Sequence, residues 1–145
     1  KYALAPYTMF IGSGALWGET ILFSMCILEE MQWKRTRYIT SADFFHGTLE
    51  LVEPGVPVFL FMGEDENRKL DERVRAFLTR GVTGDTDINI IDTAEFAIPG
   101  LDDEFRVIVS PWILSSLITD RLAAYYETVT KHNLNYRRYY HQFDY

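Results

Sequence analysis

The chain has 145 residues, of which 48% are hydrophobic and 24% charged, with a formal net charge of −7. These values are typical of one folded domain of ordinary size and exclude a disordered chain. The acidic balance argues against a nucleic-acid surface, and no apolar run approaches the roughly 18 residues that a membrane span requires. The single cysteine, Cys26, has no internal disulfide partner, so we expect a reducing, cytoplasmic setting.

Short apolar runs typical of strands alternate with helical segments along the chain. The first strand is predicted at residues 7–11, followed by a turn at Gly12-Ser13-Gly14, a helix at 16–33 and a strand at 37–40. Ser41 is then a predicted N-cap for a helical turn at Phe44 and Phe45. Next come a strand at 56–62, a helix at 65–78 capped by Asp65, a strand at 88–91 and an extended run at 96–98. A helix at 112–129 with Pro111 in its first turn comes last.

Strands separated by helices of about ten residues or more imply right-handed crossovers and a parallel sheet covered on both faces. The run VPVFLFM fits a central strand buried on both faces. The sequence therefore predicts an α/β fold, a three-layer αβα sandwich over residues 1–131, with an aromatic tail at 132–145. Ligands of such sheets sit at the carboxyl ends of strands, which makes that edge the expected working edge.

The Gly12-Ser13-Gly14 turn is a candidate substrate-binding loop, because backbone N–H groups at a helix N-terminus bind phosphate. The dinucleotide fingerprint is incomplete, since Trp17 stands where a third glycine is required. A plain tight turn is the alternative interpretation.

Two carboxylates, Glu29 and Glu30, end the apolar helix, and His46-Gly47 follows a short strand later. An apolar setting and the negative end of a helix dipole both disfavour a charged carboxylate, which suits a group that takes and returns a proton. His46 is a candidate acid or base because histidine titrates near neutral pH. The alternatives are solvated acids at a helix end and a structural histidine.

The three histidines, His46, His132 and His141, lack the spacing of metal ligands, so no metal site is predicted. The tail carries Arg137-Arg138 between tyrosines, a composition also found in nucleic-acid stacking strips. On an acidic domain we interpret the tail instead as a segment that docks on its own domain or on a partner subunit.

The order of these features resembles the sugar isomerase (SIS) family. An apolar helix ends in Glu30, a short strand follows, and then come DFFHGTL and an apolar strand beginning at Pro57. The isomerase half of glucosamine-6-phosphate synthase has a glutamate sixteen residues before the histidine of a His-Gly-Pro-Leu motif, and Glu30 precedes His46 by the same sixteen. The stretches LEEMQW, ADFFHGTLELVE and RRYY are closer to the bacterial fructosamine-6-phosphate deglycases.

The resemblance implies a sugar-phosphate substrate, no metal or cofactor, and a homodimer with its active site at the subunit interface. It also implies that the chain is the second, C-terminal unit of two SIS units. Carried over by position, Glu30 is the proton-shuttling carboxylate, and His46 assists ring opening or acts as general acid from the neighbouring subunit.

Three departures from the family pattern stand out. Thr48 replaces the proline of the histidine motif, and Tyr140-His141 stand where the synthase has a Schiff-base lysine. The Ser/Thr-rich phosphate loop of the first SIS unit is absent.

We therefore expect deglycation of a fructosamine 6-phosphate to glucose 6-phosphate and free amine. The alternatives are an aldose–ketose isomerase of a hexose phosphate, a sugar-phosphate-sensing module without turnover, and a dimerisation half.

Overall fold

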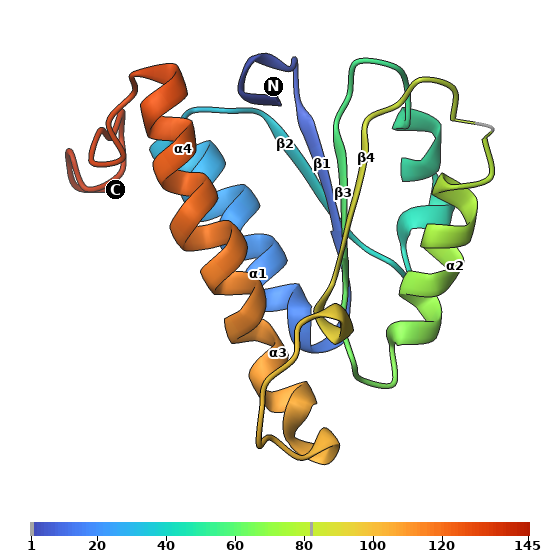
Figure 1. Ribbon diagram of the computed structural model, residues 1–145. Coiled ribbons are helices and arrows are strands. Elements are labelled where there is room, and N and C mark those ends of the chain that lie inside the picture. The colour runs from blue at the N-terminus through green and yellow to red at the C-terminus, as the bar shows by residue number, and fades with distance from the viewer. Residues whose placement is uncertain (1, 82) are drawn as a thin grey trace.

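A parallel β-sheet forms the middle layer of the molecule (Figure 1). The computed structural model describes residues 2–81 and 83–145, so Lys1 and Val82, both inside the predicted domain, lie outside the description. Across these residues the sheet has four strands in the order β2-β1-β3-β4, all parallel. The strands are β1 Thr8–Gly12, β2 Thr36–Thr40, β3 Val58–Met62 and β4 Ile88–Asp92.

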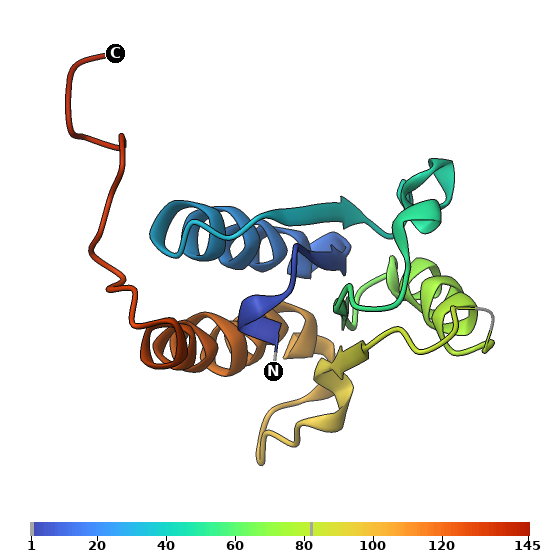
Figure 2. The same ribbon diagram turned by 90° about the horizontal axis from the view of Figure 1, so that it is seen from above.

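Helices cover both faces of this sheet, as Figures 1 and 2 show, so the predicted three-layer α/β sandwich is confirmed. One face carries α1 Trp17–Ile21, which continues as the π-helix Leu22–Met31, and a long helix made of α3 Arg106–Leu114, the π-helical segment Ser115–Asp120 and α4 Arg121–Thr130. The other face carries α2 Arg68–Leu78 and the 3₁₀ turns Phe44–His46 and Thr48–Leu51. Further 3₁₀ turns are Tyr2–Leu4, Gly14–Leu16, Thr93–Glu95 and Asp103–Phe105.

The strand β3 is buried at every position. Because successive strand residues point to opposite faces, Phe59 and Phe61 pack into the core under α1 and α4, whereas Val58, Leu60 and Met62 pack into the core under α2. The two-sided burial predicted for VPVFLFM is confirmed, although strand pairing begins at Val58.

The helix α2 begins at Arg68, three residues after the predicted cap. Asp65 does not cap it, because its carboxylate accepts the N–H of Asn67 at 2.7 Å and the N–H of Ala15 at 2.5 Å. The prediction erred because Asp65 is used by a different helix start, one that lies far away in the sequence.

The long helix begins at Arg106, so Pro111 lies inside it rather than in its first turn. A proline has no N–H to donate to the carbonyl four residues back, here that of Val107. The Ser110 hydroxyl donates to this carbonyl instead, at 3.1 Å. A local side-chain bond thus lets the helix continue past a residue that usually starts or breaks one.

With the 3₁₀ turn before it, this helix spans Asp103–Thr130. By length and composition alone it could cross a membrane, since the mean hydropathy of an 18-residue window in it is 1.3. The sequence did not predict this result. Leu114 and Ile118 on one side belong to the core, while Trp112 and Tyr125 on the other side are exposed.

Two short predictions were wrong. Ser41 caps no helix, because only 3₁₀ turns follow it and its hydroxyl donates to Asp71. The run at residues 96–98 forms no strand within the described chain and instead follows the turn Thr93–Glu95.

Asp71 joins the loops at the carboxyl ends of three strands. It lies on α2, is 1% exposed, and accepts the Ser41 hydroxyl at 2.5 Å and the Gly63 N–H at 3.3 Å. The Ser41 N–H in turn donates to the Ser13 hydroxyl oxygen at 3.0 Å. Burial raises the pKa of the Asp71 carboxyl, and the bonds from Ser41 and Gly63 only partly offset this.

We expect the buried Asp71 to make the fold less stable as pH rises. Since its folded pKa exceeds the unfolded value of 3.8, the native state binds the extra proton, and stability declines as pH rises from about 4 through the folded pKa. Asp71→Asn, which mimics the protonated acid, should show a smaller decline between pH 4 and 7 in urea unfolding. The exposed Asp85→Asn serves as control, and equal pH slopes for wild type and Asp71→Asn would contradict the prediction.

Candidate functional site

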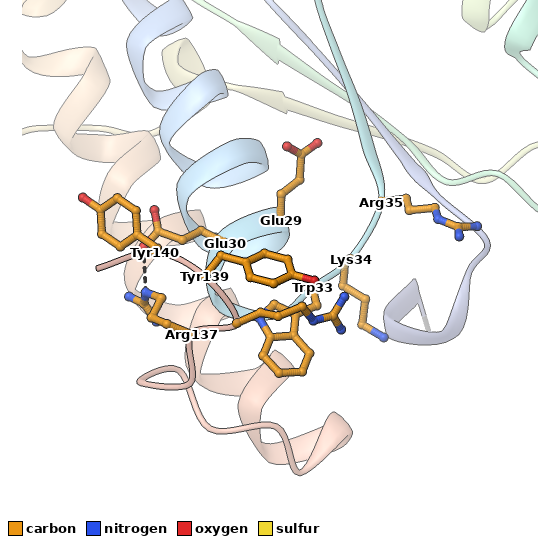
Figure 3. Close-up of a pocket in the computed structure, with 9 residues that line it drawn as sticks. Glu29, Glu30, Trp33, Lys34, Arg35, Arg137, Tyr139 and Tyr140 are labelled. Carbon is orange, nitrogen blue, oxygen red and sulfur yellow. Dashed lines mark ion pairs between the residues drawn. The ribbon is translucent and has the colours of Figure 1, made fainter. Parts of the chain in front are cut away.

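Glu30 lies on the last turn of the π-helix, near the edge of the sheet where β2 begins. This follows from topology, because a helix that joins two parallel strands must return to the starting edge (Figure 1). The Glu30 side chain is 25% exposed, and its Oε1 is ion-paired to the Arg137 Nε at 2.9 Å (Figure 3). The carboxylate is therefore held by a cation from the tail, rather than surrounded by apolar side chains as the sequence suggested.

The tail is fixed to the end of the π-helix by a buried amide. Gln32, 3% exposed, donates from Nε2 to the His132 carbonyl oxygen at 2.7 Å and accepts the Thr130 hydroxyl at 2.8 Å. The ring of Trp33 contacts the His132 ring edge-on at 4.3 Å, and the Arg138 guanidinium lies 4.3 Å over the Trp33 ring. The tail thus docks on its own domain, one of the two options that its composition suggested.

Arg137 is oriented before it reaches Glu30. Its Nη1 donates to the carbonyl oxygens of Leu134 and Tyr136, at 2.7 and 2.9 Å. A guanidinium held by two backbone carbonyls presents its Nε in a fixed direction, so the Glu30 carboxylate is positioned as well.

These contacts border an open cavity of about 460 Å³, within the range of small-molecule sites. Figure 3 shows the side chains around it, with Glu29 and Glu30 diverging from consecutive helix positions. Glu29 Oε1 accepts the Thr36 hydroxyl at 2.5 Å, which ties it to the start of β2. The lining comes from the helix end (Glu29, Glu30, Trp33), the following turn (Lys34, Arg35) and tail residues 137–140.

Cys26, one turn before Glu30, lacks the features of a nucleophile. Burial and, second, the negative charge of Glu30 raise the pKa of its thiol, which lowers the thiolate fraction. Within residues 2–81 and 83–145, no three His, Cys, Asp or Glu side chains converge as a metal site would require.

His46 lies at the carboxyl ends of the strands, whereas Glu30 lies at their amino ends. It is exposed and ends the 3₁₀ turn that follows β2. The five residues of β2 alone separate the two ends by roughly 16 Å, so the two predicted catalytic side chains do not meet within one chain.

The Gly12-Ser13-Gly14 loop lies at the carboxyl ends of the strands, as His46 does, and two polar groups there already have partners within the chain. The N–H of Ala15 donates to the Asp65 carboxylate, and the buried Ser13 hydroxyl accepts the Ser41 N–H. Gly14 has φ = 52°, and a Cβ there would overlap the Asp65 carboxylate. An anion of the chain thus sits where the sequence predicted a substrate phosphate, and the loop's role in binding stays a prediction.

Comparisons with known proteins identify relatives of this chain. No family model matches the chain. It is 32% identical to fructosamine deglycase FrlB of Bacillus subtilis over 136 residues, which cover 92% of this chain and 39% of the relative. It is 35% identical to fructoselysine 6-phosphate deglycase of Escherichia coli over 116 residues, 78% of this chain and 31% of that relative.

Solved structures give the same result. A proposed phosphosugar isomerase from Bacillus subtilis superposes with a TM-score of 0.86 at 28% identity, over 99% of this chain and 43% of that one. The chain is a deglycase-like SIS domain. A second proposed phosphosugar isomerase, from Salmonella typhimurium, matches this SIS domain with a TM-score of 0.85 at 29% identity and the same coverages. The SIS domain therefore spans less than half the length of these relatives.

The sequence singled out Glu30, which lines this cavity and whose catalytic role stays a prediction, but not the groups around it. Trp33 was assigned only to the end of a helix, Lys34 and Arg35 were given no role, and Arg137 was noted only as part of a basic tail. The usable signal was the cluster of basic and aromatic residues at the end of an acidic chain, which needed a partner of opposite charge.

Replacing Gln32 by Leu should release the tail. The change leaves the His132 carbonyl and the Thr130 hydroxyl without these bonds, at a cost of about 1–3 kcal/mol in unfolding free energy. Amide exchange of residues 132–140 should become faster, whereas the exposed tail variant Gln142→Leu should match wild type. Unchanged tail protection in Gln32→Leu would contradict the anchoring role.

Proposed function

We propose that this SIS domain is the C-terminal half of a phosphosugar enzyme that converts a fructosamine 6-phosphate into glucose 6-phosphate and free amine. The observation that supports this most is the cavity beside Glu30, where an oriented arginine holds a carboxylate at 2.9 Å. The similarity to two proteins named as deglycases supports the substrate class.

In the open-chain substrate the amine is on C1 and the ketone on C2. Glu30 removes a C1 proton to give an enaminol and returns the proton at C2 to give an aldimine, which water hydrolyses to the aldose and the amine. The C2 carbonyl acidifies the C1 proton, and a positioned base contributes typically about 10²–10⁴-fold. Arg137 holds the carboxylate in place and balances its negative charge before the first transfer and after the second.

The active site in this proposal forms between two subunits. Because Glu30 and His46 lie at opposite ends of the strands, His46 serves the Glu30 of a partner copy, where it protonates the ring oxygen or a hydroxyl. The substrate phosphate is bound mainly by the other SIS unit, since Asp65 fills the loop of this one. We place the enzyme in the cytoplasm, where Cys26 stays reduced.

Glu30→Gln in the full-length protein should reduce kcat at least about a hundredfold with little change in KM, because the amide cannot accept the proton. Release of glucose 6-phosphate from a 6-phosphorylated Amadori compound is the measurement. The exposed Glu104→Gln is the matched control and should behave as wild type. Retained turnover in Glu30→Gln would remove Glu30 from the mechanism.

Mixing two inactive variants, Glu30→Gln and His46→Asn, should restore activity. In a two-fold symmetric dimer, each mixed pair has one site with both native residues, so random exchange restores about a quarter of wild-type activity. Each variant refolded alone is the control. No recovery at any mixing ratio would show that both residues act within one subunit, whereas activity of either variant alone would show that its residue is dispensable.

An aldose–ketose isomerase is the second candidate, favoured by the structural likeness to two proposed phosphosugar isomerases. The same carboxylate would move a proton between C1 and C2 through an enediol. Conversion of fructose 6-phosphate to glucose 6-phosphate, with no activity on the Amadori compound, would identify this alternative.

A further inference from the structure

The lining of the Glu30 cavity has the opposite charge to the chain as a whole. The chain has 14 Lys and Arg against 21 Asp and Glu. Around the cavity, however, four cations face two carboxylates, Glu29 and Glu30. Clustering cations in an acidic protein creates a local attraction for an anion that the overall field repels. The cations are Lys34, Arg35, Arg137 and Arg138.

Two of these cations are free to bind a ligand. Arg137 is used by Glu30 and two carbonyls, and the Arg35 side chain extends away from the Glu30 side of the cavity (Figure 3). Lys34 and Arg138 form no ion pair among residues 2–81 and 83–145.

Arg138 is suited to a planar anion. Its guanidinium carbon lies 4.3 Å over the Trp33 ring, a cation–π contact that holds the group in place, and no hydrogen bond uses its N–H groups within residues 2–81 and 83–145. A guanidinium binds a carboxylate through two parallel hydrogen bonds. The Trp33 ring is itself held by His132, so the guanidinium is oriented before ligand arrives.

The position of Glu30 identifies the part of a substrate that would meet these cations. A base that acts on C1 lies beside the amine that C1 carries, at the opposite end of the sugar from the C6 phosphate. In an α-amino acid joined through its nitrogen, the carboxylate is three bonds from C1. A carboxylate on the amine is therefore the anion nearest to Lys34 and Arg138.

We infer that Arg138 and Lys34 bind the α-carboxylate of an amino acid carried on the C1 amine of the substrate. The inference rests on the proposed function and extends it: the tail selects glycated α-amino acids among fructosamine 6-phosphates. Arg138 forms the two-pronged contact and Lys34 contributes the second charge, while Arg137 remains with Glu30.

The test compares 6-phosphofructosyl-glycine with 6-phosphofructosyl-glycinamide, which differ only in this charge. In the full-length protein, kcat/KM should favour the carboxylate substrate at least about tenfold, as a charge-assisted hydrogen bond predicts. Arg138→Gln and Lys34→Gln should each lower the ratio of kcat/KM for the carboxylate substrate to kcat/KM for the amide. In Arg138→Gln this ratio should fall to about two or less. The exposed Arg80→Gln should keep the wild-type ratio.

Calorimetric binding of both compounds to the Glu30→Gln protein reads the subsite without turnover. If Arg138→Gln abolishes carboxylate-dependent binding while the wild-type enzyme converts neither compound, the proposed reaction is rejected and the subsite is kept. Equal wild-type kcat/KM and affinity for the two compounds, or a ratio unchanged in both variants, would overturn the subsite alone. If Arg138→Gln instead changes only the discrimination against unphosphorylated fructosyl-glycine, the cations bind the phosphate and the inference is wrong.

Discussion

The two-sided burial of β3 is the constraint from which the rest of the architecture follows. A strand with apolar side chains on both faces needs helices on both sides of the sheet. Those helices must connect parallel strands, so each returns the chain to the edge where it started. This return carries Glu30 to the amino ends of the strands, while His46 follows β2 at their carboxyl ends. The separation of the two side chains is thus a property of the topology, and for this reason the proposed mechanism takes His46 from a second copy.

The cavity, by contrast, is built by polar contacts on the outside of this core. Gln32 fixes the root of the tail, Trp33 carries the Arg138 guanidinium, and Glu30 pairs with Arg137. Each bond alone is modest, but all three join the same two segments, so they order a stretch of chain that has no helix or strand of its own in residues 131–145. A charged pocket on an acidic protein is the result.

The strands and the layers could be predicted because their signals are local, and the position of Glu30 at the end of its helix could be predicted for the same reason. Hydrophobic runs set the strands, and the spacing between Glu30 and His46 carried the family resemblance. The errors arose where distant residues compete. Asp65 reads as a helix cap until Ala15 becomes its partner, and Pro111 reads as a helix start until Ser110 replaces the missing bond. The tail's contribution was hidden because ion pairing between residues 30 and 137 leaves no periodic trace in the sequence.

The bond between Asp65 and the Ala15 N–H makes the first helix start sensitive to a single substitution. Beside Gly14, at the helix start, the Ala15 N–H donates to the Asp65 carboxylate, an anion that belongs to the chain itself. Loss of that single side chain would free this N–H. A single substitution at position 65 would therefore convert a helix start that is closed by the chain itself into one that is open to an external anion.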